Sequence, residues 1–499
     1  MFSQKLALSY GSKLIVQMIQ MATSLIVARL VGPSVLGVLA YGLAFVSMFS
    51  FIVDMGTGTA YVKLITDGND QKAILGTFLR IKLSLILLFI FVVISSLLYS
   101  KSGSLSNISL NLQDKVILIY LVITVMSFLY SIQTTHWTSL MQQAKVDLPQ
   151  LLQQIVYQLL RLAAAFAGYK ALGIVISNFI ACLVVLPLYL WMGKGLSIGK
   201  FEKSIAILFL KISFPVILIG IFQVLIYSTD KVLLKHFTDV RELGYYSASF
   251  TIASFMRGIE SSVGILFFPF ITTYLKESKI DKVSNIIARF ESFSLTFIVP
   301  FTILFVIMSD KVILLAYGNE FLPAVKPLSL LLLTFTVSLF LLPYGNIILG
   351  KGKFYLAAII WAAAFFVYIL TAFFLTSPAY LNLQGQGMAI ALLISNLFLG
   401  LVFVLETKKI EKEIKVLPGL KVLLFNLIVA IIFGSIYYYF IADNNFLWSV
   451  AFAVCYILFF YLSGYFLKVF GMDQLYLLKN ILSIRKLKLY IREELLPKK

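Results

Sequence analysis

Hydrophobic segments that are long enough to cross a lipid bilayer follow one another along most of this chain. A helical crossing needs about 20 mainly apolar residues, because each helical residue advances the chain by about 1.5 Å. This requirement gives about fourteen predicted crossings joined by short loops. They run approximately over residues 9–31, 36–62, 77–99, 116–141, 151–168, 171–193, 209–234, 243–270, 289–309, 326–349, 354–376, 385–406, 421–441 and 446–467. The pattern predicts an all-α polytopic membrane protein.

Composition supports this fold class and narrows the chemistry. Of the 499 residues, 61% are hydrophobic and 13% are charged, and the mean hydropathy is +0.98, far outside the range of soluble domains. The two cysteines, Cys182 and Cys455, both fall inside predicted crossings, so the sequence offers no disulfide framework and no cysteine metal site. It also shows no nucleophile beside a base and no soluble catalytic domain. We therefore predict neither an enzyme nor a bound cofactor.

The distribution of basic residues predicts the orientation. The formal net charge is +19, but the basic residues lie between apolar segments and not on one amphipathic face, which argues against nucleic-acid binding. About thirty of the 41 Lys and Arg residues fall in alternate loops, as the positive-inside rule requires of the cytoplasmic side. We therefore predict a multi-pass protein of the cytoplasmic (inner) membrane with both termini in the cytoplasm.

Three predicted crossings carry polar or cationic residues where hydrocarbon would be expected. A cation near the middle of a crossing costs at least a few kcal/mol unless something solvates it, so these residues predict a polar interior path. In the first and fifth crossings they recur along one face of a helix. The predicted substrate-binding residues are Lys13, Gln17 and Gln20 in the first crossing, Gln154, Tyr157, Gln158 and Arg161 in the fifth, and Arg257 in the eighth. A cationic path is typical of a transporter for a large anionic molecule.

Acidic residues in or beside the crossings are candidates for ion coupling. A buried carboxylate can bind and release a cation or a proton during a transport cycle. Asp54, Asp230 and Glu260 meet this description. The alternative is a structural ion pair, for example between Arg257 and Glu260 at i and i+3, or between Arg161 and a carboxylate on another helix. The sequence leaves both interpretations open.

A weak internal repeat indicates two similar halves. Residues 31–41, which start Val31-Gly32-Pro33, align with residues 238–248, and both stretches occupy the same topological position. Two six-crossing units of equal orientation are related by a pseudo-two-fold axis along the membrane normal. The predicted domains are an N-terminal six-helix lobe (1–200), a C-terminal six-helix lobe (201–410), two additional transmembrane helices (411–470) and a basic amphipathic cytoplasmic tail (471–499).

Two anchor motifs carry a family resemblance. The first runs from Ala28 to Ala40 and continues in Asp54-Met55-Gly56-Thr57-Gly58-Thr59-Ala60; the second is Ser228-Thr229-Asp230-Lys231-Val232-Leu233-Leu234. They resemble the starts of the two halves of Wzx-type polysaccharide flippases, in the multidrug/oligosaccharidyl-lipid/polysaccharide (MOP) exporter superfamily. The resemblance covers approximately the first 410 residues.

The resemblance implies a specific activity and specific partners. It implies a flippase that moves polyprenyl-diphosphate-linked oligosaccharide from the cytoplasmic to the outer leaflet, for O-antigen, lipopolysaccharide or capsule biosynthesis. It further implies alternating access, H+ or Na+ as the coupling ion, contact with membrane lipids, and a polysaccharide polymerase and chain-length machinery as partners. Fixed cations suit the diphosphate, and amides and hydroxyls suit the sugars. The alternative is a multidrug or cation exporter of the same superfamily, whose substrates would favour carboxylates over arginines in the path.

Overall fold

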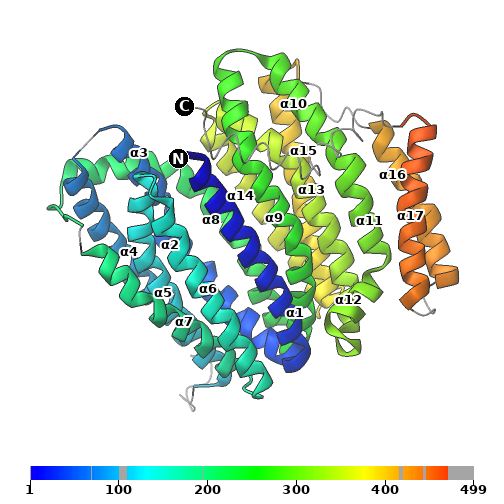
Figure 1. Cartoon of the computed structure of the whole chain (residues 1–499), viewed down its shortest axis with the longest axis horizontal. Helices are drawn as coiled ribbons and strands as arrows, with labels where there is room; N and C mark the ends of the chain where they lie inside the picture. Colours follow the sequence, from blue (N-terminus) through cyan, green and yellow to red (C-terminus); the bar gives the residue numbers. More distant parts are fainter. Residues whose placement is uncertain are drawn as a thin grey trace. The chain divides into compact units, whose positions relative to one another are not determined.

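The computed structural model describes residues 2–68, 70–100, 110–194, 196–414, 420–441 and 446–469, with the side chains of 2–18, 259–266, 269 and 420 left aside. Every regular element in these ranges is helical, which confirms the all-α class (Figure 1). The first eight helices are α1 (Phe2–Met48), α2 (Phe51–Asp54), α3 (Thr57–Thr66), α4 (Gln71–Tyr99), α5 (Leu112–Ser139), α6 (Gln143–Phe166), α7 (Ala171–Gly193) and α8 (Lys203–Phe237).

The remaining elements include two π-helical turns and one 3-10 helix. They are α9 (Val240–Lys276), α10 (Ile280–Phe293), the π-helix η1 (Ser294–Ile298), α11 (Val299–Ile307), α12 (Ser309–Tyr317), the 3-10 helix η2 (Asn319–Ala324), α13 (Val325–Gly350), α14 (Phe354–Thr376), α15 (Gln384–Ile410), α16 (Leu420–Ile436), the π-helix η3 (Tyr437–Ile441) and α17 (Phe446–Phe466). The predicted tail 471–499 lies outside the described residues.

The number of crossings agrees with the predicted topology. Among the described residues, 11 helical segments are long and apolar enough to span a bilayer. One of them, residues 19–66, is divided at Gly32, where φ is 75°, so it contains two crossings. α6 and α9, with 24 and 37 residues, are also longer than a crossing requires, although they carry Arg161 and Arg257. The described helices therefore account for the prediction of about fourteen crossings.

The chain forms two compact units, residues 1–247 and 248–499. Their boundary lies inside α9 and not at the predicted division after residue 200. In the first unit, α8 packs against α1, α3 and α4, which places it with the preceding helices. The bounds of the predicted lobes come from the sequence repeat, whereas the bounds of these two units come from contacts within the fold. The lobe bounds therefore remain a prediction.

The second crossing is not the single helix that the sequence predicted over residues 36–62. It is interrupted between α2 and α3, where Met55 (φ 31°) and Gly56 (φ 60°) both adopt left-handed backbone conformations. An added Cβ on Gly56 would lie 3.3 Å from the backbone oxygen of Ser213 in α8, so the break also brings two backbones close together. The hydrophobic pattern did not reveal this break because apolar residues continue on both sides of it.

The two repeat segments contact each other through corresponding residues. A Cβ added to Gly37 would lie 1.9 Å from the carbonyl oxygen of Val240, and a Cβ added to Gly244 would lie 1.9 Å from the carbonyl oxygen of Pro33. In the sequence alignment, Gly37 corresponds to Gly244 and Pro33 corresponds to Val240. The contact is therefore reciprocal, as expected for segments that are related by a local two-fold axis.

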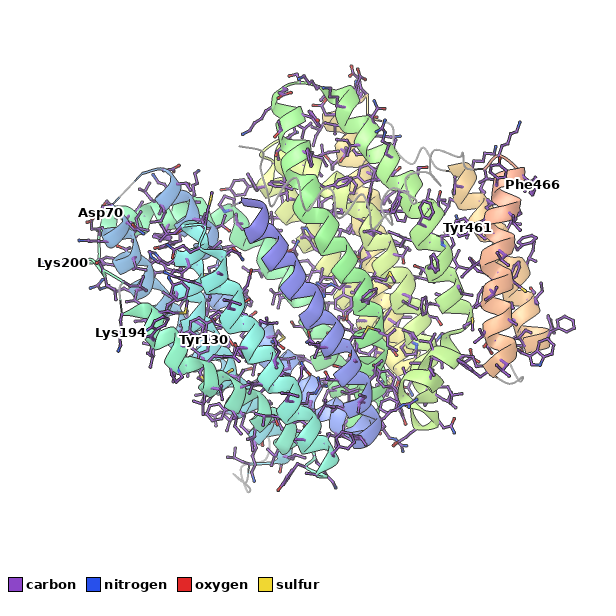
Figure 2. All side chains as sticks on the ribbon, in the orientation of Figure 1. Asp70, Tyr130, Lys194, Lys200, Tyr461 and Phe466 are labelled. Carbon is purple, nitrogen blue, oxygen red and sulfur yellow. The ribbon has the colours of Figure 1, made fainter. Side chains whose placement is uncertain are left out.

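Some of the described contacts near the helix ends join segments that the predicted topology places on the same side of the membrane. They include a backbone hydrogen bond of 2.9 Å in the first unit, and in the second unit an ion pair and a hydrogen bond of 2.7 Å. The contacting pairs are Lys72 with Gly199, Lys351 with Glu411, and Asp310 with Tyr437. In Figure 2, Asp70, Lys194 and Lys200 lie toward the same end of the first unit.

Aromatic and aliphatic side chains from α1, α4, α5 and α7 form the core of the first unit. Tyr130 stacks on Tyr189 with ring centroids 4.2 Å apart, and its hydroxyl donates a hydrogen bond of 2.8 Å to the carbonyl of Cys182. This bond satisfies a polar group that would otherwise be costly inside the bilayer. This core holds α1 and α6 in place, because both helices contribute side chains to it.

The two C-terminal helices are held to the second unit by side chains that reach backbone carbonyls. Asn426 of α16 donates to Leu295 at 2.9 Å, and Tyr461 of α17 donates to Thr296 at 3.3 Å. Both acceptors belong to the π-helix η1, where the regular bonding pattern of the α-helix is interrupted. The π-helix thus provides acceptors for α16 and α17.

Candidate functional site

Arg161 lies on the face of α6 that packs against α1. It is 8% exposed, and its Nη1 donates hydrogen bonds to Ser24 Oγ at 3.1 Å and, more weakly, to Gln158 Oε1 at 3.4 Å. Its guanidinium carbon lies 5.7 Å from the ring centroid of Tyr157. The stripe predicted in the fifth crossing therefore does gather around this arginine.

Gln158 links the stripe of α6 to the stripe of α1. Its Oε1 accepts a hydrogen bond of 2.6 Å from Thr23, and its side chain is 2% exposed. Gln154 lies one turn earlier on α6 and is half-buried. On α1, Gln20 is exposed, and its carbonyl accepts a bond from Thr23. We define Thr23, Ser24, Gln154, Tyr157, Gln158 and Arg161 as the α1–α6 cluster.

The α1–α6 cluster has more hydrogen-bonding capacity than its protein contacts use. Arg161 Nε, Gln158 Nε2 and Gln154 Oε1 are buried and have no hydrogen-bond partner. Within the described ranges, no carboxylate comes within 4.0 Å of Arg161, so the ion pair considered from the sequence is absent there. A buried cation without a countercharge is unusual, because burial removes its hydration. The cluster therefore suits an anionic group that also accepts and donates hydrogen bonds.

Three other predicted substrate residues are not included in the α1–α6 cluster. The side chains of Lys13 and Gln17 fall outside the described residues, although α1 runs through both positions. Arg257 belongs to α9 in the second unit, where its guanidinium carbon lies 5.8 Å from the ring centroid of Phe335. Glu260, its predicted structural partner, has a side chain outside the described residues. These three roles remain predictions.

Asp54 lies at the break between α2 and α3, beside the buried Lys82. Its carboxylate is 70% exposed and lies 3.9 Å from Lys82 Nζ, whereas Lys82 is only 3% exposed. Lys82 also donates a 2.9 Å hydrogen bond to the carbonyl of Val53. This ammonium therefore satisfies backbone at the helix break, and it belongs to the protein interior and not to a loop.

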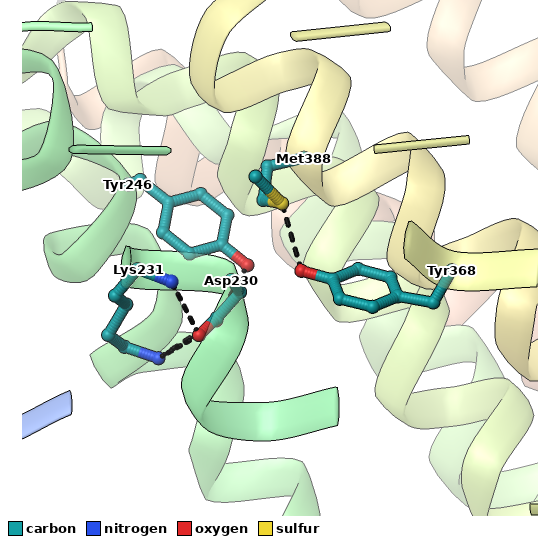
Figure 3. A network of polar contacts seen from close by, with 5 residues as sticks. All are labelled: Asp230, Lys231, Tyr246, Tyr368 and Met388. Carbon is teal, nitrogen blue, oxygen red and sulfur yellow. Dashed lines mark hydrogen bonds and ion pairs between the residues drawn. The ribbon is translucent and has the colours of Figure 1, made fainter. Parts of the chain in front are cut away.

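Asp230 is fully buried and both of its carboxylate oxygens have partners (Figure 3). Lys231 Nζ donates to these oxygens at 2.8 and 3.1 Å, and the Lys231 backbone N–H donates at 2.7 Å. Tyr246 adds a bond of 3.0 Å from α9. Asp230 is therefore fully bonded in this conformation. In the second unit, Tyr368 donates to the sulfur of Met388 at 2.9 Å, as Figure 3 also shows.

Two further polar side chains, His136 and Glu291, lie within predicted crossings. His136 Nδ1 and the hydroxyl of Tyr61 share a hydrogen bond of 2.6 Å, which joins α5 to α3. Glu291 of α10 is 0% exposed and hydrogen bonds to the hydroxyl of Tyr344. The sequence pattern does not single out Glu291, because this residue stands near the start of the predicted crossing 289–309, where a loop carboxylate is common. Its presence in a predicted crossing was the signal that could have found it.

Comparison with solved structures identifies proteins that share this fold. The fold matches "Lipid II flippase MurJ, inward closed conformation" with a TM-score of 0.66 and 16% identity, covering 93% of this chain and 99% of that one. It also matches the "Inward-facing conformation of a multidrug resistance MATE family transporter of the MOP superfamily" with a TM-score of 0.60 and 12% identity, over 81% and 99%. At these identities the likeness shows the fold alone, an all-helical fold with many membrane-spanning helices.

The family follows from the sequence match. Residues 26–326 match the family described as "Polysaccharide biosynthesis protein". This match covers more than half of the chain, so the chain belongs to that family, in agreement with the predicted resemblance to polysaccharide flippases. The comparison with curated proteins gives no match.

Proposed function

We propose that this protein is a flippase that moves polyprenyl-diphosphate-linked oligosaccharide from the cytoplasmic to the outer leaflet for cell-surface polysaccharide biosynthesis. Its family and its fold support this reading. The observation that carries the proposal is Arg161, a buried guanidinium with no carboxylate within 4.0 Å in the described part of the chain. A diphosphate supplies the missing negative charge.

The rest of the α1–α6 cluster matches the other half of such a substrate. A sugar carries many hydroxyls, which pair with amides such as Gln154 and Gln158, and its ring stacks on aromatic faces such as Tyr157. The unused atoms Gln154 Oε1 and Gln158 Nε2 are one acceptor and one donor. Lys13, Gln17, Gln20 and Arg257 are proposed as further substrate contacts along the path.

The energy source proposed for transport is an ion gradient, of H+ or Na+. Asp54, Asp230 and Glu260 remain the candidates from the sequence. Asp54 is the most accessible of the described carboxylates in this group, at 70% exposed beside the buried Lys82. Asp230 would have to exchange its bonds with Lys231 and Tyr246 in order to bind an ion. Polymerase and chain-length proteins are proposed as partners because they would receive the exported units.

Complementation tests the proposed activity. In a strain that lacks its own flippase and carries the cognate glycan pathway, this protein should restore the surface polymer, measured by glycan blotting. Arg161→Ala should leave lipid-linked oligosaccharide in the inner leaflet, where membrane-impermeant glycosidase cannot reach it. Absence of restored polymer, together with protection against cationic dyes, would contradict the proposal and support a cation exporter.

Cysteine labelling tests the proposed orientation. Cys455 is exposed and is replaced first with serine, while Cys182 is buried and can stay. A membrane-impermeant maleimide should label Asn382→Cys in intact cells and Lys409→Cys only after permeabilisation, because the proposed topology places these two exposed residues on opposite sides. Labelling of both positions in intact cells would break the proposed alternation of loops.

A further inference from the structure

Glu291 stands in the middle of the helical segment 280–307, one of those apolar enough to span the membrane. It is fully buried, and Tyr344 of α13 bonds to its Oε1. Its Oε2 has no hydrogen-bond partner, and no lysine or arginine within the described ranges comes within 4.0 Å. A carboxylate without a countercharge is strongly disfavoured in such surroundings, whereas the neutral acid is tolerated.

Another unsatisfied polar atom lies close to Glu291 along the chain. Ser294 follows it by one turn, at the first residue of η1, and the buried Oγ of Ser294 has no partner. π-helical turns interrupt the regular bonding of a helix and often mark functional positions. This region therefore combines a carboxyl group with a local irregularity and unused polar atoms.

The other titratable groups on the packed elements are already engaged or exposed. Arg289, Asp281 and Lys282 on α10 are exposed, and η1 and α11 carry no charged residue. On α9, Arg257 lies over Phe335, and the side chain of Glu260 is outside the described residues. The remaining groups bond elsewhere: Tyr461 to Thr296, Tyr456 to Pro300, Lys421 to Lys468, Lys351 to Glu411 and Lys409 to Glu406.

We propose that Glu291 is a proton-binding site that loads and releases one H+ during the transport cycle. The carboxylate takes up one proton from water to form the neutral acid and later returns it, so the step requires no other reactant. Tyr344 remains its hydrogen-bond partner in both forms, because a phenol can donate to a carboxylate and accept from a carboxylic acid. The inference rests on the proposed transport function and names the coupling ion as a proton.

Infrared difference spectroscopy of the purified, reconstituted protein tests proton binding without any transport. Wild-type protein should show the carbonyl stretch of a protonated carboxyl group, and raising the pH should remove it. Glu291→Gln should lack this band. Tyr344→Phe should retain the band at a shifted frequency, and it provides the test if Glu291→Gln does not fold.

The matched control is Glu277→Gln. Glu277 stands in the turn between α9 and α10, where the hydrogen bond from Lys279 at 2.6 Å lowers the pKa of its carboxyl group. It should therefore be ionised near neutral pH, and Glu277→Gln should keep the full band.

A transport measurement then links the site to coupling. In proteoliposomes, an imposed pH gradient should stimulate flipping by the wild-type protein and by Glu277→Gln, and should give no stimulation with Glu291→Gln. Three outcomes would overturn the proposal: a wild-type protein without the band, a band that survives in Glu291→Gln, or a band that no accessible pH removes. Loss of the band on adding Na+ at constant pH would also overturn it, in favour of a metal cation. Because the spectra do not depend on substrate, they stand even if the protein carries a different glycan or drug.

Discussion

Replacing Arg161 with alanine is expected to reduce export of the lipid-linked oligosaccharide strongly while the protein remains folded and inserted. A hydrogen bond to a charged group contributes about 1.5–3 kcal/mol, which corresponds to a decrease in substrate affinity of about 10- to 100-fold. The loss should not harm folding, since removing an unpaired buried cation also removes its desolvation cost. Flipping of labelled substrate in proteoliposomes and size-exclusion chromatography measure the two effects separately.

Three companion variants separate the charge of Arg161 from its bulk. Arg161→Lys should be partly active, because a point charge still attracts the diphosphate without the bidentate geometry. Arg161→Met should be as inactive as Arg161→Ala, although it retains much of the volume. Lys145→Ala removes an exposed cation from the same helix and should export normally. Full activity of Arg161→Met would show that the position serves packing, and the proposed contact with substrate would be wrong.

The α1–α6 cluster illustrates how much of a site the sequence can predict in a membrane protein. Polar residues inside hydrocarbon are so costly that their helical spacing defines a face, and Gln154, Gln158 and Arg161 were found in this way. Their partners, Thr23 and Ser24 of α1, depend on which helix packs against α6 and at what height. That information is in the tertiary structure, because short loops allow several helix arrangements.

The contacts of other polar residues could not be predicted from the sequence, for local reasons. Lys82 lies inside the predicted crossing 77–99, but the sequence does not show that α4 carries its ammonium to the break before α3. Asp230 binds Lys231, although side chains at adjacent helical positions do not normally face each other. α6 starts at Gln143, whereas the predicted fifth crossing starts at residue 151. The first two turns of α6 are hydrophilic, so a search for apolar segments does not include them.

The largest effect on stability is expected from alanine at the reciprocal glycine contact. Gly37→Ala and Gly244→Ala would each place a Cβ 1.9 Å from a backbone carbonyl oxygen, a distance that no rotamer change can relieve. The two helical segments would have to separate, so each variant should lower stability by about 3 kcal/mol, the upper part of the range for overpacking. The double variant should lose less stability than the sum of the two single losses, because the first substitution already separates the segments that the second would push apart.

Gly220→Ala in α8 and Gly434→Ala in α16 are the matched controls, since a Cβ at either position meets nothing within 4 Å. Melting of the detergent-solubilised variants, followed by fluorescence-detected size-exclusion chromatography, compares all five proteins. If Gly37→Ala and Gly244→Ala melt with the controls, the repeat segments do not make this close contact in the membrane, and the local two-fold relation loses its strongest structural support.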